Sequence, residues 1–423
     1  MKLMMIHTPR GVEDILPQEA RLYQWIEREA SFLFSLYGYE EIRTPIFEKT
    51  ELFLRSLGEE TDVGKQMYIF EDKKGRRLCL RPEATAPVVR AYLQHKLYRE
   101  LKEWKVYYTG SMFRYERPQA GRSREFRQIG IEAIGEESPH LDVEVIEMAW
   151  QFFKRIGLDN LQLQLNSIGC KKCRPSYERE LRDYLEKNIN SLCATCQRRY
   201  QYNILRVLDC KNEMCQSVVK GAPRIGDYLC RDCDAHFQEV RKELESFGIE
   251  FSLAPHLVRG LDYYTRTIFE ITSPSLGAQD ALCAGGRYDD LIEELGGPSI
   301  PAMGFAMGVE RILIALRKRG EETFPRSPSL VYIATLNKEG WRAGYRLAGL
   351  LRSKGIRTQL NSSERSLSSQ LKLADRREIR WVMILGDEEI KNNRVILKDM
   401  DSGAQQKLRW KELDKFSEEL RKS

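Results

Sequence analysis

The chain has 423 residues, of which 42% are apolar and 31% charged, a composition typical of a globular protein with a sizeable core. It is too long for one small domain and suits two or three. No apolar run approaches the roughly 20 residues that span a bilayer, and the first residues lack the apolar stretch of a signal peptide. We therefore expect a cytoplasmic protein without a membrane segment.

The charge is distributed unevenly along the chain. The net charge is +6, yet residues 326–423 alone carry 21 Lys and Arg against 13 Asp and Glu, or +8. The remaining residues therefore sum to −2. A basic final segment on a nearly neutral body indicates a polyanionic partner for that segment. A solvated basic face is the alternative interpretation.

The first predicted element is a helix over Pro17–Tyr37, where apolar residues recur every three or four positions. Proline suits the first turn of a helix, and Gly38 suits its end. A short strand is expected near Tyr39–Thr44, and it should end at Pro45.

Two hairpins are predicted next. Met67–Glu71 and Arg77–Arg81 flank a turn, and a helix should begin at Pro82. Ser111–Arg117 and Glu125–Ile134 form the arms of a second hairpin, which an arginine-rich loop connects.

The region Gly169–Phe247 differs in character, with paired cysteines and charged helical runs, and we interpret it as an inserted domain. Strand patterns return at Thr267–Ile271 and Ala281–Ala284. Pro301–Arg317 then changes from a glycine-spaced strand into a helix.

The last part of the chain alternates between strands and helices after a predicted linker at 321–328. Strands are expected at Leu330–Thr335, Ile356–Leu360 and Trp381–Leu385, with a helix after the first strand and another at Leu367–Ile379. This alternation predicts a small α/β domain. The sequence has neither a P-loop nor a Rossmann glycine pattern, so neither kind of nucleotide site is expected.

The second hairpin predicts a polar pocket. Side chains alternate along a strand, so Gln128 and Glu132 should share one face of their arm, with Gly130 between them. On the other arm Arg114 and Glu116 should share a face. We expect these four polar side chains on a pocket floor, with Gly130 leaving room for a ligand. An exposed sheet face with ion pairs is the alternative.

The cysteines indicate metal sites. Eight of the ten fall within 64 residues, as three C-x-x-C pairs and one wider pair: Cys170, Cys173, Cys193, Cys196, Cys210, Cys215, Cys230 and Cys233. Four thiolates can close a structural zinc site, and eight could make two, but the sequence does not give the pairing. Small buried side chains or free thiols are the alternative. A thioredoxin-like role is disfavoured because no βαβ pattern surrounds the pairs.

Several segments together resemble the class II aminoacyl-tRNA synthetases and, within them, the histidyl-tRNA synthetase family. Three resemble the class motifs, namely 10–14, 113–126 and 304–311, and two resemble stretches specific to the histidine enzymes, namely 257–265 and 284–289. The segment 81–85 adds a further match to the family. Ala84 stands where many members of the family have Gly, a small change. The resemblance covers nearly the whole chain.

The resemblance implies a fold and a domain order. It implies an α+β catalytic domain, whose antiparallel sheet is flanked by helices, in two parts at 1–169 and 248–322. A mostly helical insertion would occupy 170–247 and an α/β anticodon-binding domain 327–423. The family joins L-histidine to tRNA(His) with ATP and Mg²⁺ and works as a homodimer, with the first class motif at the dimer interface.

The resemblance also implies roles for individual residues. Arg259 and Arg114 would be catalytic, at the α-phosphate. Histidine would be bound by Glu83, Ala84, Thr85, Arg114, Gln128, Glu132, Arg259, Tyr263, Tyr264 and Tyr288, with Glu132 at the imidazole. ATP would be bound by Arg114, Glu116, Arg122, Phe126 and Arg311.

Two alternatives share this fold. One is a non-catalytic relative, the regulatory subunit of ATP phosphoribosyltransferase, which typically loses the last domain and several active-site residues. The other is a synthetase-like RNA-sensing module of the kind found fused to kinases. This chain keeps Arg114, Arg259, Arg311 and the last domain and has no kinase motifs, which argues against both.

Overall fold

The computed structural model describes residues 6–58, 61–119, 121–320, 330–361, 365–413 and 416. The chain separates into two compact units, residues 1–324 and 325–423. The expected linker at 321–328 and the expected domain limits at 322 and 327 lie outside the described residues. None of the described helices is both long and apolar enough to cross a membrane.

The first unit is built on a sheet with the strand order β1-β5-β6-β11-β10-β9-β7-β8. The strands are β1 (Glu40–Glu41), β5 (Trp104–Phe113), β6 (Glu125–Ile134), β7 (Gln162–Ser167), β8 (Ser252–Leu253), β9 (Thr265–Thr272), β10 (Ala281–Arg287) and β11 (Ala302–Gly308). Neighbours from β5 to β7 are antiparallel, whereas short β1 and β8 add in parallel at the two edges. This confirms the predicted antiparallel fold.

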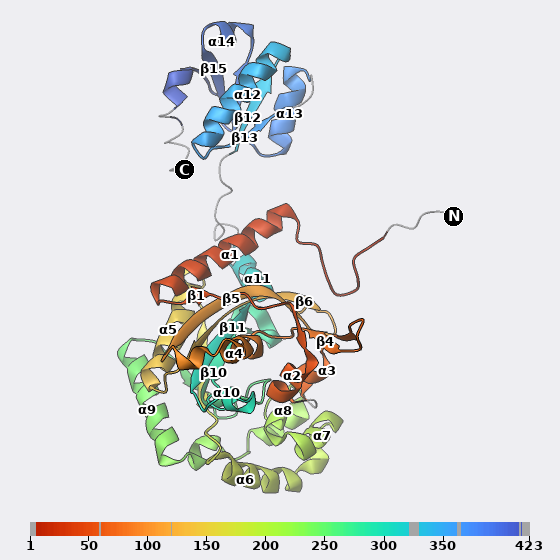
Figure 1. Cartoon of the computed structure of the whole chain (residues 1–423), viewed down its shortest axis with the longest axis vertical. Helices are drawn as coiled ribbons and strands as arrows, with labels where there is room; N and C mark the ends of the chain where they lie inside the picture. The colour runs from red at the N-terminus through yellow and green to blue at the C-terminus, as the bar shows by residue number, and fades with distance from the viewer. Residues whose placement is uncertain are drawn as a thin grey trace, which may run out of the picture. The chain divides into compact units, whose positions relative to one another are not determined.

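Helices cover one face of this sheet (Figure 1). They are α1 (Pro17–Leu36), α5 (Pro139–Arg155), α9 (Arg231–Ser246) and α11 (Val309–Arg319). Their apolar stripes pack with alternate side chains of the strands into one core. The helix predicted over Pro17–Tyr37 is therefore confirmed to within one residue.

The opposite face carries smaller elements and the polar side chains. They are a three-stranded sheet of β2 (Phe47–Lys49), β4 (Arg77–Leu80) and β3 (Ile69–Glu71), with α2 (Thr50–Leu57), α3 (Asp62–Lys65), α4 (Thr85–Gln94), α10 (Leu291–Glu294) and the short 3-10 helix η1 (Leu97–Arg99). The 3-10 helix η5 (Pro274–Gln279) instead packs beside α11. The first predicted hairpin is β3–β4. The helix expected from Pro82 begins three residues later, at Thr85.

The predicted alternation along β6 is confirmed. Ile129 and Ile131 are buried in the core beneath the helices, whereas Gln128 and Glu132 face the other side of the sheet. The other arm was predicted at Ser111–Arg117, but the strand there, β5, begins earlier, at Trp104, and ends at Phe113. Arg114 and Glu116 follow the strand rather than alternate within it.

The inserted region is helical, as predicted (Figure 1, green). It contains α6 (Arg174–Lys187), α7 (Ala194–Tyr202), α8 (Glu213–Val219), α9 and three 3-10 turns, η2 (Ile189–Ser191), η3 (Ile204–Val207) and η4 (Ile225–Tyr228). Apart from α9, its apolar side chains join the core on the same side as α2 and α4.

The second unit is a five-stranded sheet in the order β13-β12-β14-β15-β16 with helices packed on it. Its elements are β12 (Leu330–Thr335), α12 (Lys338–Ser353), β13 (Arg357–Leu360), α13 (Leu367–Arg376), β14 (Trp381–Leu385), α14 (Asp387–Lys391), β15 (Arg394–Asp399), β16 (Gln405–Arg409) and η7 (Trp410–Glu412). The predicted strands are present. The antiparallel pair β15–β16 was not predicted.

Candidate active site and cysteine clusters

A cavity of about 830 Å³ opens on the polar face of the large sheet, a volume within the usual range for sites that hold small ligands. Its walls include the side chains singled out from the sequence: Glu83, Thr85, Arg114, Glu116, Arg122, Phe126, Gln128, Glu132, Arg259, Tyr263, Tyr264, Tyr288 and Arg311. Ala84 does not line the cavity. It is fully buried at the start of α4, in a small apolar cluster with Val88 and Val106.

Glu132 lies at the deep end of the cavity, with 1% of its surface exposed. Its carboxyl accepts hydrogen bonds from the Tyr288 hydroxyl and from Thr85 Oγ1, the latter at 2.7 Å. Gly304 pairs with it on β11, where a Cβ would lie 2.1 Å from Glu132 Oε2. Burial raises the pKa of Glu132 to about 8, and the two hydroxyl donors only partly oppose the shift.

Glu83 lines the cavity and also binds backbone N–H groups at the start of α4. Its carboxylate accepts the backbone N–H of Thr85 at 2.6 Å and of Ala86 at 3.0 Å, which satisfies free donors at the start of α4. Burial raises the pKa of Glu83, and these backbone donors oppose the rise. The residue therefore both caps the helix and presents a fixed carboxylate to the cavity.

The space above Gly130 is filled by protein, so the expectation that this glycine leaves room for a ligand is wrong. Tyr108 lies directly opposite it on β5, and a Cβ on Gly130 would lie 2.3 Å from the tyrosine hydroxyl. The glycine instead lets the Tyr108 ring lie flat across the sheet and reach the cavity.

Tyrosines enclose the deep end. The rings of Tyr263 and Tyr264 lie 4.9 Å apart, and those of Tyr263 and Tyr288 lie 5.8 Å apart. Within the described chain, Tyr108 Oη and Gln128 Oε1 are buried without a protein hydrogen-bond partner. Buried polar atoms are seldom left unpaired, so these atoms mark places where a polar ligand would be stabilised.

Cationic and aromatic side chains gather towards the mouth. Arg114 donates from Nε to the Pro82 carbonyl at 2.9 Å, and its guanidinium carbon lies 5.1 Å from the centre of the Phe126 ring. Arg122 Nη1 lies 3.4 Å from Glu116 Oε2. Burial lowers the pKa of Arg114, and the nearby carboxylates of Glu116 and Glu83 only partly oppose the shift.

Arg259 and Arg311 complete the cationic wall. Arg259 Nη1 lies 3.2 Å from Glu270 Oε1, while its Nε has no protein partner within the described chain. Burial opposes the charge of Arg259, but Glu270 outweighs this effect and the pKa is raised. Arg311 donates from Nη1 to the Ala281 carbonyl at 3.0 Å and from Nε to the Gly121 carbonyl at 3.4 Å. The three arginines 114, 259 and 311 therefore face one cavity.

Several residues of this wall were not predicted from the sequence. Tyr108 and Glu270 lie on largely buried strands, and a charged residue inside the otherwise apolar run Ile268–Ile271 was a usable signal for Glu270. Four others come from the insertion, namely Arg206, Asp209, Lys211 and Gln216. Nothing in the local sequence pattern indicated that the insertion reaches the cavity.

The eight clustered cysteines separate into two groups of four. Cys170, Cys173, Cys230 and Cys233 form the first cluster, and Cys193, Cys196, Cys210 and Cys215 form the second cluster. Within each cluster the sulfur atoms lie within 4.8 Å of one another, and all ten cysteines of the chain are free of disulfides. Either group could hold a zinc ion, so the structure supplies the pairing that the sequence left open.

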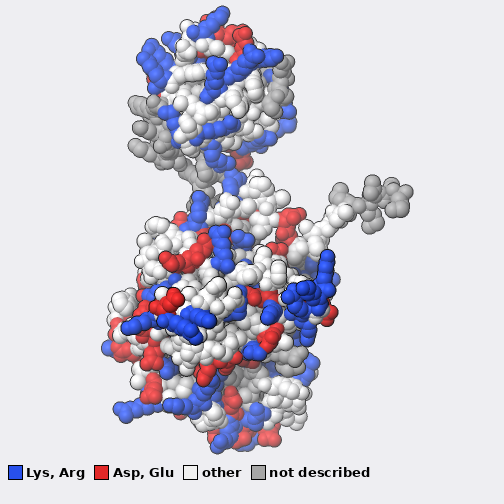
Figure 2. All heavy atoms as spheres, viewed as in Figure 1, with Lys and Arg blue, Asp and Glu red and all other residues white. Residues whose placement is uncertain are grey.

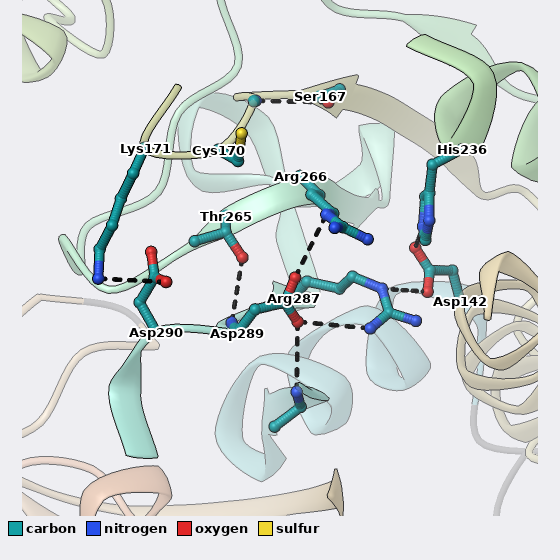
Figure 3. A network of polar contacts seen from close by, with 12 residues as sticks. Asp142, Ser167, Cys170, Lys171, His236, Thr265, Arg266, Arg287, Asp289 and Asp290 are labelled. Atoms are coloured by element: carbon teal, nitrogen blue, oxygen red, sulfur yellow. Dashed lines mark hydrogen bonds and ion pairs between the residues drawn. The ribbon is translucent and has the colours of Figure 1, made fainter. Parts of the chain in front are cut away.

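A network of polar contacts joins the first cluster to the large sheet (Figure 3). Beside Cys170, Lys171 Nζ lies 3.2 Å from Asp290, and Arg266 next to the cluster lies 3.5 Å from Asp289. Asp289 also contacts Arg287, which is fully buried and forms an ion pair with Asp142 at 2.6 Å. His236 of α9 meets the same Asp142 at 2.7 Å. Arg287 and Asp289 flank Tyr288, so this network fixes the strand end that carries a cavity residue.

Known proteins resemble the chain over almost its full length. Residues 11–312 match the histidyl-tRNA synthetase family and residues 330–420 match an anticodon-binding domain. A histidine–tRNA ligase of Halothermothrix orenii is 49% identical over 404 residues, covering 95% of this chain and 96% of that protein.

Solved structures agree with these matches. The apo histidyl-tRNA synthetase of Staphylococcus aureus is 37% identical with a TM-score of 0.81, covering 97% of this chain and 99% of that one. A Bacillus halodurans structure described as an ATP phosphoribosyltransferase regulatory subunit/histidyl-tRNA synthetase has a TM-score of 0.67 at 22% identity, covering 90% and 99% of the two chains, and shows the fold alone. The chain therefore belongs to the histidyl-tRNA synthetase family, the histidine–tRNA ligases of class II, with an anticodon-binding domain at its C-terminal end.

Proposed function

We propose that this chain activates L-histidine with ATP, forming histidyl-adenylate and pyrophosphate, and transfers the histidyl group to tRNA(His). The observation that supports this most directly is the cavity itself. One buried carboxyl, Glu132, lies at its deep end, and Arg114, Arg259 and Arg311 surround its wider part.

The deep end is proposed to bind histidine. Glu132 can accept a hydrogen bond from an imidazole N–H, and the tyrosines around it enclose a planar ring. Glu83 would hold the amino group, with Thr85 and Gln128 beside it. The hydroxyls of Tyr288 and Thr85 fix the Glu132 carboxyl, so it is oriented before the ligand arrives.

The mouth is proposed to bind ATP with Mg²⁺. Phe126 would stack on the adenine and Glu116 would accept from its amino group, while Arg122 and Arg311 would hold the outer phosphates. Arg114 and Arg259 would face the α-phosphate. Arg114 and Phe126 already lie close together, which brings the base and the α-phosphate positions side by side.

Histidine at the deep end and ATP at the mouth would react in one displacement at the α-phosphorus. A carboxylate oxygen of histidine attacks the α-phosphorus in line, the bond to the bridging oxygen breaks, and pyrophosphate leaves with its electron pair. Charge builds on the non-bridging oxygens, where fixed guanidinium groups stabilise it most. In the second step a terminal ribose hydroxyl of the tRNA attacks the histidyl carbonyl and AMP leaves.

The C-terminal unit is proposed to bind the anticodon of tRNA(His). Its net charge is +8, and Lys and Arg are spread over its surface in Figure 2, which suits a phosphate backbone. Two stacked aromatic side chains of α12, Trp341 and Tyr345, are exposed on this unit with ring centres 5.5 Å apart.

We further propose a cytoplasmic homodimer. Apolar side chains on and beside α1 are exposed in the single chain, among them Leu16, Phe32 and Leu36, as expected of a surface that a second copy covers. Free thiols throughout the chain suit a reducing compartment.

Histidine-dependent exchange between ATP and labelled pyrophosphate tests the activation step. We expect exchange that requires histidine and is not supported by other amino acids, together with charging of tRNA(His). A folded, pure sample without exchange would instead favour the regulatory relative named above.

Both cysteine clusters are proposed to hold a structural zinc ion. Tetrahedral Zn–S bonds of about 2.3 Å put sulfur atoms about 3.8 Å apart. The distance is 3.7 Å between the sulfurs of Cys170 and Cys173 and 3.9 Å between those of Cys193 and Cys210. Backbone N–H groups also point at the sulfurs: that of Cys230 lies 3.1 Å from Cys173 Sγ, and that of Cys193 lies 3.2 Å from Cys215 Sγ.

Metal analysis of protein purified without added zinc tests this proposal. We expect two zinc ions per chain, one for each cluster. Cys170→Ser should lower the content to one, whereas Cys79→Ala, which alters a buried cysteine outside both clusters, should leave it at two. A content near zero in the unaltered chain would rule out the metal.

A further inference from the structure

The second cluster lies beside the loop that carries Arg259. The chain between Cys196 and Cys210 forms the end of α7 and the 3-10 helix η3, and both ends of this segment are held at the cluster. The sulfurs of Cys193 and Cys210 lie 3.9 Å apart, so a metal there would close this stretch into a short loop.

This closed segment contacts the Arg259 loop through its polar side chains. Arg206 Nη1 donates to the Arg259 backbone carbonyl at 3.1 Å and lies 3.2 Å from Asp209. Asn203 donates to the Asp262 carboxylate at 2.7 Å, on the far side of the same loop. Residues 254–264, which include Arg259, have no regular secondary structure, so they depend on such contacts for their position.

Apolar side chains of this segment and of the Arg259 loop also share one core cluster. Ile204, Val207 and Leu208 belong to the same core cluster as Val258 and Tyr263, on either side of Arg259. Arg206 is itself 9% exposed and lines the cavity together with Arg259. A buried arginine that bonds a backbone carbonyl fixes that carbonyl more firmly than a surface side chain could.

We propose that the second cluster, with its zinc, positions Arg206, and that Arg206 in turn holds the Arg259 loop in the orientation needed for adenylate formation. The inference rests on the proposed activation chemistry and on zinc at this cluster. Arg206 is then a positioning residue that acts through Arg259 and need not touch either substrate.

The two clusters contact different parts of the fold. The first cluster is tied to the sheet by the network of Lys171, Arg266 and Asp289 (Figure 3), and its helix α9 packs in the main core. The second cluster has no strand of the large sheet beside it in sequence, and the segment 203–210 is its bridge to the active site. Loss of the metal from the second cluster should therefore affect the reaction itself.

Arg206→Met tests the positioning role, with Arg206→Lys as the conservative variant. For Met we expect kcat of histidine-dependent exchange to fall about 10- to 100-fold, because a small displacement of a catalytic group costs that much. The KM values for histidine and ATP should change less than about 2-fold. Lys can still donate to the Arg259 carbonyl and should recover part of kcat. Arg179→Met, which alters an exposed arginine of α6, is the matched control and should behave as the unaltered chain.

A double-variant cycle separates this role from a general loss of structure. If Arg206 acts through Arg259, then Arg206→Met should cause no further loss of kcat in an Arg259→Ala background. Equal losses of kcat in both backgrounds would overturn the inference. So would full kcat in Arg206→Met. Thermal unfolding of each variant shows whether the fold is intact.

Cys210→Ser tests the part played by the metal. We expect one zinc ion per chain in place of two and a fall in kcat similar to that of Arg206→Met. Zinc loss with unchanged kcat would overturn the link between cluster and loop. Unaltered protein that contains no zinc would overturn the metal proposal, and unaltered protein without exchange would overturn the proposed function.

Discussion

The two ends of the cavity are built differently. At the deep end Glu132 lies on β6 and Glu83 lies beside the start of α4, while Tyr263 and Tyr288 lie just outside strands β9 and β10. Glu132, Tyr263 and Tyr288 are almost fully buried. Towards the mouth, Arg122 lies on a loop and Arg259 on an irregular segment, and the paired charges are partly open to solvent. One end is acidic and hydroxyl-rich and the other is cationic.

The difference follows from what each end would have to recognise. A small rigid ring is best distinguished by groups that cannot move, and strands hold their side chains more precisely than loops do. A triphosphate is long and highly charged, so arginines from several segments surround it, each able to pair with phosphate oxygens through its planar fork of donors. The comparison predicts that variants at the deep end affect histidine and variants at the mouth affect ATP.

Arg259→Ala should have the largest effect, because Arg259 lies where the two ends meet. Removing a cation aimed at the developing charge should lower kcat of exchange about 100- to 1,000-fold. The KM values for both substrates should change much less, which pre-steady-state and steady-state exchange measurements would show. Arg380→Ala, an exposed arginine of the C-terminal unit, is the control. Near-normal exchange in Arg259→Ala would remove Arg259 from the reaction.

The sequence predicted the parts of this site that depend on local periodicity. Alternation along β6 correctly put Gln128 and Glu132 on one face and Ile129 and Ile131 on the other. It failed at Gly130, because the neighbouring strand supplies Tyr108 in register, and register between strands is not visible in a single strand's pattern. The place of Arg206 in the cavity wall was not predicted either, since only the tertiary packing of the insertion brings that residue to the cavity.

Glu132→Gln should have the next largest effect and should be confined to histidine. Gln keeps the shape but loses the negative charge that would accept the imidazole N–H. A hydrogen bond to a charged group contributes about 1.5–3 kcal/mol, so at pH 9, where the carboxylate predominates, the KM for histidine should rise roughly 10- to 100-fold. The KM for ATP should stay within about 2-fold. An equal rise in both KM values would contradict the separation of the two ends.

The pH dependence sharpens the same test. Burial raises the pKa of Glu132 to about 8, so in the free protein the neutral carboxyl predominates at pH 7 and the carboxylate forms as the pH rises. Histidine binding to the carboxylate should therefore strengthen, and its KM should fall, between about pH 7 and pH 9. The same ionisation is unfavourable in the folded chain, so stability is lost as the pH rises through that pKa. In Glu132→Gln both trends should vanish, and an unchanged KM profile would exclude Glu132 as the titrating group.

Phe126→Leu should have the smallest effect and should be confined to ATP. Leu keeps an apolar side chain but removes the flat ring on which adenine would stack and which the Arg114 guanidinium faces at 5.1 Å. Such aromatic contacts contribute about 0.5–1.5 kcal/mol beyond burial, so the KM for ATP should rise roughly 2- to 12-fold. The KM for histidine should be unchanged, since Phe126 and Glu132 lie six residues apart on β6, at opposite ends of the cavity. Steady-state exchange with each substrate varied in turn measures both values. A rise in the KM for histidine would mean that the two ends of the cavity are coupled through β6 and do not act as separate binding surfaces.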